Sequence, residues 1–493
     1  MIEPTLLEQR RAGLLLHPTS LPGSFLGGDI GPEAFRFIDF LADSGCSVWQ
    51  MLPLGPTHED GSPYQCLSVN AGNPLLISLD WLVDHDWLDL SQLEIPRDSA
   101  EYRTQCLKLA FQKFSNKNDK AWAKNLKVFT KKQANWLNDF TLFMVLKEVF
   151  DDVSWNEWPV ALTHRTNKAL KEARIKYAEQ IAQIEFEQFV FFTQWSELRA
   201  YAHERAVKLF GDMPIFVSFD SSDVWACREN FLMDKDGQCE FIAGVPPDAF
   251  SDTGQRWGNP LYDWDYLQST KFDWWVQRFA TQLELFDIIR VDHFRGFEAS
   301  WFIPADEETA IIGEWVKTPG KELLQVLNEN FKSLPLVAED LGVITDEVVE
   351  LRNQFSLPGM KILQFAFDGD SRNLYLPHHH EKRCVVYTGT HDNDTTLGWY
   401  LALDENSKRF LHDYLGVDEE AYLDMPWVLN RMALASVANL AILPMQDILS
   451  LDSSHRMNEP STTEGNWSWS FEWEQLWPSL STDLNKLIKL YNR

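Results

Sequence analysis

Cysteine is scarce in this chain. Only six of its 493 residues are cysteines, they are widely spaced, and no two of them form a CxxC pair. Structural zinc sites and disulfide-stapled domains need clustered ligands of this kind. We therefore expect reduced thiols in the core and no metal site. The run His378, His379 and His380 does not change this expectation, because adjacent loop residues rarely point to one metal centre.

Long apolar runs are also missing. No stretch of about 18 apolar residues marks a membrane-spanning helix, and residues 1–9 show no basic region followed by an apolar stretch. These absences argue against a membrane partner and against a secretion signal. We expect a cytoplasmic protein that is a monomer or a weak homo-oligomer.

Basic residues are outnumbered by acidic ones. Lys and Arg total 44 against 73 Asp and Glu, which gives a formal net charge of −29. Such a surface repels nucleic acid and anionic lipid, so neither is expected as a partner. A neutral substrate fits this charge better than an acidic one. The charge also serves solubility, and that interpretation alone would account for most of it.

The chain does contain buried strands that end at acidic residues. Three of them read IIRVDH at 288–293, LVAED at 336–340 and CVVYTGTHD at 384–392. Runs of this length that are rich in Val and Ile predict strands buried on both faces. In all, eight apolar runs predict strands, at 13–16, 48–52, 214–217, 288–291, 335–338, 361–367, 384–387 and 440–443.

Segments with helical periodicity separate most of these eight strands. Strands alternating with helices predict an α/β fold of the (β/α)8 TIM barrel type. A doubly wound sheet is the alternative, but eight units with acids at one end favour closure. In both folds the catalytic side chains lie at the carboxyl ends of the strands.

Two segments are too long to be ordinary barrel loops. Residues 81–205 lie between the second and third strands and show long helical runs, which predicts an inserted helical subdomain. Residues 227–264 are rich in Gly, Pro, Asp and aromatics and predict a loop insertion over the active site. The catalytic barrel then comprises 1–80 and 206–493. Too few residues follow the eighth strand for a C-terminal β-sandwich.

Acids at the ends of the predicted strands are suited to glycoside chemistry. Arg290 and Asp292 alternate along one strand, so both point to the same side and the arginine would keep the carboxylate ionised; a purely structural ion pair is equally consistent. Glu339 ends a buried strand, where partial desolvation would keep it protonated. The alternative role, capping the next helix, suits Asp340 better. A glycosidase needs one ionised and one protonated carboxyl group.

Other residues near these acids suggest sugar contacts. His391 and Asp392 together could bind adjacent sugar hydroxyls, although an Asx turn would use similar residues. Tyr64 follows the second strand in a turn and could stack under a sugar ring. The 21 tryptophans either stack on sugars in this way or fill the core.

Several motifs make a family resemblance specific. They are RVDHFRG at 290–296, AEDLG at 338–342, GTHDN at 389–393 and GVPPDAFSDTGQRWGNP at 244–260, within a match that runs from HPTSLPG at 17–23 to EGNW at 464–467. With them the chain resembles the 4-alpha-glucanotransferases, also called amylomaltases or disproportionating enzymes, of glycoside hydrolase family 77 in the alpha-amylase superfamily. Ordinary amylases lack the motif at 244–260.

The resemblance implies roles for named residues. Asp292 would be the nucleophile, Glu339 the acid/base and Asp392 the stabiliser of the transition state, with no cofactor. Substrate contacts would come from Arg290, His293, His391, Tyr64, Trp257, Phe250, Asp212, Ser68 and Asn466. The chain departs from the family pattern at Ala249, where some members carry an aromatic residue, and at Ser461, where glycine is common.

The implied activity is a retaining transglycosylation. A segment of a donor α-1,4-glucan would pass through a covalent glycosyl-enzyme to the 4-hydroxyl of an acceptor glucan, maltooligosaccharide or glucose, with cyclic glucans among the possible products. A plain α-amylase-type hydrolase is the rival enzyme, and a silent glucan-binding protein is the rival outside enzymes. The three acids argue against the second rival, and the missing β-sandwich and the insertion at 244–260 argue against the first.

Overall fold

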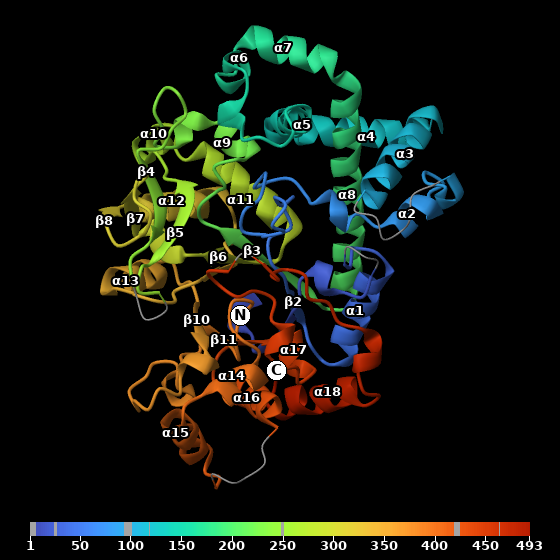
Figure 1. Ribbon diagram of the computed structural model, residues 1–493. Coiled ribbons are helices and arrows are strands. Elements are labelled where there is room, and N and C mark those ends of the chain that lie inside the picture. The colour runs from blue at the N-terminus through green and yellow to red at the C-terminus, as the bar shows by residue number, and fades with distance from the viewer. Residues whose placement is uncertain are drawn as a thin grey trace.

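Eight parallel strands form the central sheet of the protein. The computed structural model describes residues 6–23, 27–92, 101–117, 119–247, 251–418, 424–462 and 464–493. Within these ranges the strands are hydrogen-bonded in the order β10-β11-β12-β1-β2-β3-β6-β9 (Figure 1). Their bounds are β1 Arg11–Leu15, β2 Val48–Gln50, β3 Lys208–Pro214, β6 Ile288–Asp292, β9 Leu336–Ala338, β10 Gly359–Ile362, β11 Cys384–Tyr387 and β12 Leu440–Pro444.

The end strands β9 and β10 meet and close this sheet into a barrel. The backbone N–H of Ala338 donates to the carbonyl of Pro358 at 2.9 Å. The N–H of Met360 donates to Oδ1 of Asp340 at 2.7 Å, so a side chain completes the junction. The predicted (β/α)8 barrel is confirmed. Asp340 is not the helix cap that the sequence suggested, because the next helix begins after Thr345.

The third strand begins earlier than predicted. β3 spans Lys208–Pro214, and the apolar run 214–217 shares a single residue with it. Gly211 and Asp212 interrupt the apolar pattern of the real strand. Both have physical reasons to be there, because a Cβ at position 211 would lie 2.2 Å from the ring of Phe286 and Asp212 carries a buried ion pair.

Amphipathic helices cover the outside of the barrel. In α1 (Pro32–Asp43) the residues Ala34, Phe37, Ile38 and Leu41 recur every three or four positions and are fully buried. The α-helices that follow β3 in the chain are α9 Ser222–Ala226, α10 Trp264–Ser269, α11 Asp273–Leu285, α12 Gly320–Asn330, α13 Asp346–Gln354, α14 Thr396–Ala402, α15 Glu405–Leu415, α16 Met425–Ala435, α17 Met445–Ile448 and α18 Leu480–Leu490. None of the helices in the described part of the chain is long and apolar enough to cross a membrane.

The segment between β2 and β3 is helical. At the upper right of Figure 1 these helices stand apart from the barrel strands, and α8 extends from them down to the barrel. Their shared core is aromatic: the ring of Phe186 lies 4.9 Å from that of Phe114 and 5.7 Å from that of Trp87. Their bounds are α2 Leu79–Asp84, α3 Tyr102–Lys117, α4 Lys120–Lys132, α5 Ala134–Val149, α6 Val160–Thr163, α7 Asn167–Lys176 and α8 Ala178–Glu204.

A second sheet lies beside the barrel and was not predicted. Its four antiparallel strands follow the order β5-β4-β7-β8, at the left of Figure 1. Two of them, β4 Phe241–Val245 and β5 Gln255–Pro260, belong to the segment that the sequence presented as a loop. The others, β7 Ala299–Pro304 and β8 Glu314–Lys317, come from the connection between β6 and β9. No strand follows β12 in the described ranges up to residue 493.

Candidate active site

Three acidic residues share one cavity at the carboxyl ends of the strands. Asp292 is the last residue of β6, Glu339 directly follows β9, and Asp392 lies in the loop after β11. All three line a pocket of about 430 Å³, which is within the range of about 300–1,000 Å³ for small-ligand sites. The sequence therefore placed these acids correctly at one end of the barrel.

Arg290 holds two carboxylates at once. Its Nη1 lies 2.6 Å from Oδ2 of Asp212, and its Nη2 lies 2.8 Å from Oδ1 of Asp292. The arginine and Asp212 are buried, whereas the side chain of Asp292 is 28% exposed and reaches the cavity. Oδ1 of Asp212 is buried and has no hydrogen-bond partner within the described residues. The ion pair with Arg290 thus fixes the orientation of the Asp292 carboxylate.

Both carboxylate oxygens of Glu339 accept backbone hydrogen bonds. Oε2 accepts a hydrogen bond from the backbone N–H of His293 at 2.7 Å, and Oε1 accepts one from that of Leu341 at 3.0 Å. His293 achieves this with a left-handed backbone, at a φ of 53°. Such conformations are costly for residues other than glycine and cluster at functional sites. Burial also lowers the pKa of His293 to about 3, so its ring is neutral.

Asp392 is held by residues from two loops. His391 Nε2 lies 3.3 Å from Oδ2 of Asp392, and the Asn458 side chain donates to Oδ1 at 2.6 Å. Arg456 donates to the backbone carbonyl of Asp392 at 3.3 Å. Asn458 and Arg456 were not predicted. They lie in the loop after α17, and no local pattern there marks them.

The three carboxyls have different protonation tendencies. Burial raises the pKa of Asp292 to about 6, against the pull of the Arg290 charge. Burial raises the pKa of Glu339 to about 7, again against Arg290, and the charge of Asp292 adds to the increase. Burial opposes ionisation of Asp392 as well. The charge of His391, together with hydrogen bonds from His391 and Asn458, outweighs this effect and holds the pKa of Asp392 below its ordinary value. Glu339 is thus the carboxyl most ready to keep a proton.

Aromatic rings form a platform beside Asp392. Tyr64 stacks on His391 with ring centres 5.0 Å apart and an angle of 14° between the planes, and its hydroxyl donates to Asp212 at 2.7 Å. Trp467, which was not among the predicted site residues, lies 5.9 Å from the Tyr64 ring. The Tyr64 ring is thereby fixed within the site.

Two pockets meet at the carboxylates. The first, described above, contains Glu339; the second, of about 360 Å³, contains Tyr64 and Trp467 but not Glu339. Both include Asp292, His293 and Asp392. Both are also lined by Gln255, Trp257, Pro460 and Ser461. The Trp257 ring meets that of His293 edge to face at 4.9 Å. Together the pockets form a cleft that runs past the acids.

Ser461 occupies a backbone conformation that favours glycine. Its φ is 69°, in the left-handed region that costs a side-chain-bearing residue free energy. The family preference for glycine at this position, noted from the sequence, therefore has a conformational reason. Ala249, the other departure from the family pattern, and Phe250, a predicted substrate contact, lie outside the described residues.

Ser68 and Asn466 are placed differently from the other predicted contacts. Ser68 is 2% exposed, and its hydroxyl accepts from the backbone N–H groups of Asn70 and Ala71; it lines a small pocket behind Tyr64 rather than the cleft. Asn466 borders the cleft but bonds within its own loop, accepting from the N–H of Glu459 at 2.9 Å. The structure gives both residues clear roles in supporting loops.

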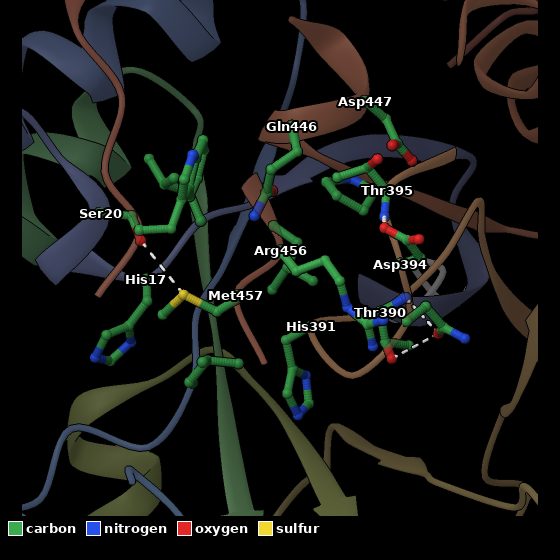
Figure 2. A pocket seen from close by; sticks show the side chains of 16 residues that line it. His17, Ser20, Thr390, His391, Asp394, Thr395, Gln446, Asp447, Arg456 and Met457 are labelled. Carbon is green, nitrogen blue, oxygen red and sulfur yellow. Dashed lines mark hydrogen bonds between the residues drawn. The ribbon is translucent and has the colours of Figure 1, made fainter. Parts of the chain in front are cut away.

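A small pocket is lined by His391 and by residues of the loop that follows it. Figure 2 shows His17 and His391 at one end of it and Asp447 with Thr395 at the other. Asp447 accepts hydrogen bonds from the hydroxyls of Thr388 and Thr396 at 2.6 and 2.7 Å. These bonds anchor both ends of the loop that carries His391 and Asp392.

Comparison with known proteins identifies relatives along almost the whole chain. The 4-alpha-glucanotransferase family, glycoside hydrolase family 77, matches residues 16–475. A 4-alpha-glucanotransferase of Synechocystis is 47% identical, with 99% of each chain covered. One of Thermus thermophilus is 46% identical, covering 98% of this chain and 99% of its own.

Solved structures give the same result. Amylomaltase from Streptococcus agalactiae, determined in complex with acarbose, matches with a TM-score of 0.94 and 36% identity, over 98% of this chain and 100% of its own. Amylomaltase from Corynebacterium glutamicum matches with a TM-score of 0.79 and 18% identity, over 98% of this chain and 75% of its own, and shows the shared fold.

Proposed function

The chain belongs to the 4-alpha-glucanotransferase family and is an enzyme of that kind, and on this premise we propose how its residues divide the work. Asp292 is the nucleophile, Glu339 the acid/base and Asp392 the stabiliser of the transition state. The substrates are α-1,4-glucans and maltooligosaccharides, with glucose as one acceptor. The unequal environments of Asp292 and Glu339 carry this assignment, because one carboxyl must attack while the other holds a proton.

In the first half of the reaction the glycosidic bond breaks. Glu339 donates its proton to the glycosidic oxygen while ionised Asp292 attacks the anomeric carbon. The Asp292–carbon bond forms, and the reducing-end fragment leaves with the proton as a new hydroxyl. Asp392, ionised by its contacts with His391 and Asn458, faces the positive charge that develops on the sugar ring.

In the second half the segment moves to its acceptor. Glu339, now a carboxylate, removes the proton from the 4-hydroxyl of an incoming glucan, whose oxygen attacks the anomeric carbon and displaces Asp292. The configuration is retained after two inversions. The neutral ring of His293, whose Nε2 has no hydrogen-bond partner within the described residues, is suited to hydrogen-bond a sugar hydroxyl in the cleft. Asp212 lines the small pocket with Ser68 and supports Arg290 and Tyr64 from there.

Transfer prevails over hydrolysis only if an acceptor sugar outcompetes water. Trp257 and Pro460 line both pockets of the cleft, as do Asp292 and Asp392. An aromatic side chain at that point both excludes water and offers a face for a sugar. We place Trp257 in that role, together with Phe250 from the same insertion.

Incubation with pure maltotriose tests the function. Transfer converts it into glucose and a ladder of longer oligosaccharides, which size separation resolves. Asp292→Asn, which keeps the shape of the nucleophile but removes its charge, should abolish the ladder. If wild-type enzyme yields only shorter sugars, the α-amylase-type hydrolase is the better description.

The remaining proposals concern the setting of the enzyme. All six cysteines are free thiols, which suits a cytoplasmic protein. We further propose that residues 81–205 act as a helical subdomain on one side of the barrel mouth, and that the insertion 227–264 lies over the active site.

A further inference from the structure

The side of the cleft that receives the acceptor can be identified from Glu339. The acid/base must reach the bond between the sugar attached to Asp292 and the sugar that leaves or enters. Glu339 lines one of the two pockets, and Tyr64 lines only the other. If the proposed function holds, the pocket with Glu339 therefore binds leaving and incoming glucans.

An apolar wall borders this acceptor pocket. We call it the apolar shelf, and it comprises Val245, Pro246, Trp315, Leu341 and Val343. Trp315 belongs to β8 of the second sheet, whereas Leu341 and Val343 follow the barrel strand β9. Val343 is 55% exposed, so its side chain is accessible at the edge of this wall. The shelf thus joins two separate parts of the molecule at one rim.

Arg295 fixes Trp315 to this rim. The Arg295 guanidinium lies 3.8 Å from the centre of the Trp315 ring, and its Nη1 donates to the carbonyl of Val343 at 2.5 Å. Arg295 is 7% exposed, so the guanidinium is largely shielded from water where it meets the half-buried Trp315 ring. The indole of Trp301 supports Trp315 from another direction, with ring centres 5.4 Å apart.

The same segments also hold the acid. The N–H groups of His293 and Leu341 bind the two oxygens of Glu339. Arg295 lies two residues beyond the first of these groups, and Val343 two residues beyond the second. Trp315 is therefore positioned relative to the Glu339 carboxyl through short, hydrogen-bonded stretches of chain. This rigidity is what a sugar-binding platform needs.

We propose that Trp315, held by Arg295, is an acceptor-binding residue that contacts a sugar beyond the one whose 4-hydroxyl attacks. This inference rests on the proposed function. It means that the second sheet selects acceptors by length. Glucose fills only the position next to Glu339, whereas maltose and maltotriose extend along the apolar shelf to Trp315.

The test measures how strongly acceptor length matters. The donor is α-maltotriosyl fluoride without its non-reducing 4-hydroxyl, so that it cannot act as an acceptor itself. Transfer to glucose, maltose and maltotriose is followed at varied acceptor concentration. Trp315→Leu keeps an apolar side chain but removes the aromatic face. It should raise the KM for maltotriose about three- to tenfold relative to that for glucose, and Trp315→Phe should restore most of the difference.

Two further variants keep the result interpretable. Val343→Ser changes an exposed side chain of the shelf without endangering the fold, and should reduce the preference for maltotriose in the same direction. Trp477→Leu alters a tryptophan that packs on Trp427, away from the cleft residues, and should leave the preference unchanged.

Each outcome is decisive. If wild-type enzyme gives no transfer product, the proposed function fails before the variants are compared. If wild-type transfers but Trp315→Leu and Val343→Ser keep the full preference for maltotriose, this inference is overturned. It is also overturned if Trp315→Leu weakens glucose and maltotriose equally, because Trp315 would then serve the attacking sugar or the fold alone.

Discussion

Asn458 donates a hydrogen bond of 2.6 Å to Asp392, although 66 residues separate them. Together with the contact to His391, the bond orients a carboxylate whose side chain is 47% exposed. Hydrogen bonds to charged groups contribute about 1.5–3 kcal/mol. Asn458→Ala should therefore lower kcat on maltotriose roughly 10- to 100-fold, measured as initial glucose release.

The loss should appear mainly in kcat, because the bond matters most when charge develops on the sugar. Asn485→Ala is a matched control, since Asn485 donates to the backbone of Asp43 and touches none of the three carboxyls. A kcat for Asn458→Ala within twofold of wild type would contradict the role given to the bond.

The activity should depend on pH as a narrow bell. Attack needs Asp292 ionised, and its raised pKa of about 6 means that activity falls as the pH drops through that value. Proton donation needs Glu339 protonated, so activity falls as the pH rises through about 7. The measurement is kcat/KM for maltotriose between pH 4.5 and 9. A rate that keeps increasing up to pH 9 would show that Glu339 is not the acid.

Removal of the acid should spare donors that need no protonation. Glu339→Ala should lose nearly all activity on maltotriose but still release fluoride from α-maltotriosyl fluoride, because fluoride leaves without a proton. Added azide needs no general base and should intercept the glycosyl-enzyme. NMR of the product should show an α-glycosyl azide. A β-azide would mean that no covalent intermediate forms on Asp292.

Gly211 predicts a stability effect within the barrel. A methyl group there would lie 2.2 Å from the Phe286 ring, and Phe286 is 2% exposed and has little room to move. Gly211→Ala should lower the free energy of unfolding by about 1–3 kcal/mol, seen as a lower melting temperature. Phe286→Leu in the same chain should recover part of the loss. If the two losses simply add, the contact is not the cause.

The sequence predicted the barrel because local pattern and burial agree in most of its strands. β11 has the predicted bounds, since an uninterrupted apolar run fills it. The predicted bounds of β3 were displaced from the observed ones because Gly211 and Asp212 interrupt its apolar pattern. Contacts with other elements require both residues, and no local pattern reveals those contacts. β4 and β5 were missed because they are short and lie in a segment rich in Gly and Pro, and because β4 pairs with β7, some sixty residues later.

The candidate site divides in the same way. Asp292, Glu339 and Asp392 end apolar runs, so their positions followed from the strands. Asn458, Arg456 and Trp315 carry no such mark, because each acquires its place through a contact distant in sequence. Ser461 was noticed as a departure from a family pattern, but its left-handed backbone could be known only from coordinates.

The junction between β9 and β10 has a consequence for how mutants of this enzyme should be classified. The Asp340 side chain accepts from the N–H of Met360 and pairs with Arg352, and its neighbour in the chain is Glu339. A residue that closes the barrel, Asp340, and the proposed acid/base, Glu339, are thus consecutive in the chain. A substitution of Asp340 that abolishes activity would resemble the loss of a catalytic group. The actual damage would be to the contacts that close the barrel between β9 and β10. Only Glu339 should allow rescue by azide, so adjacent acids of equal apparent importance can be told apart by chemistry.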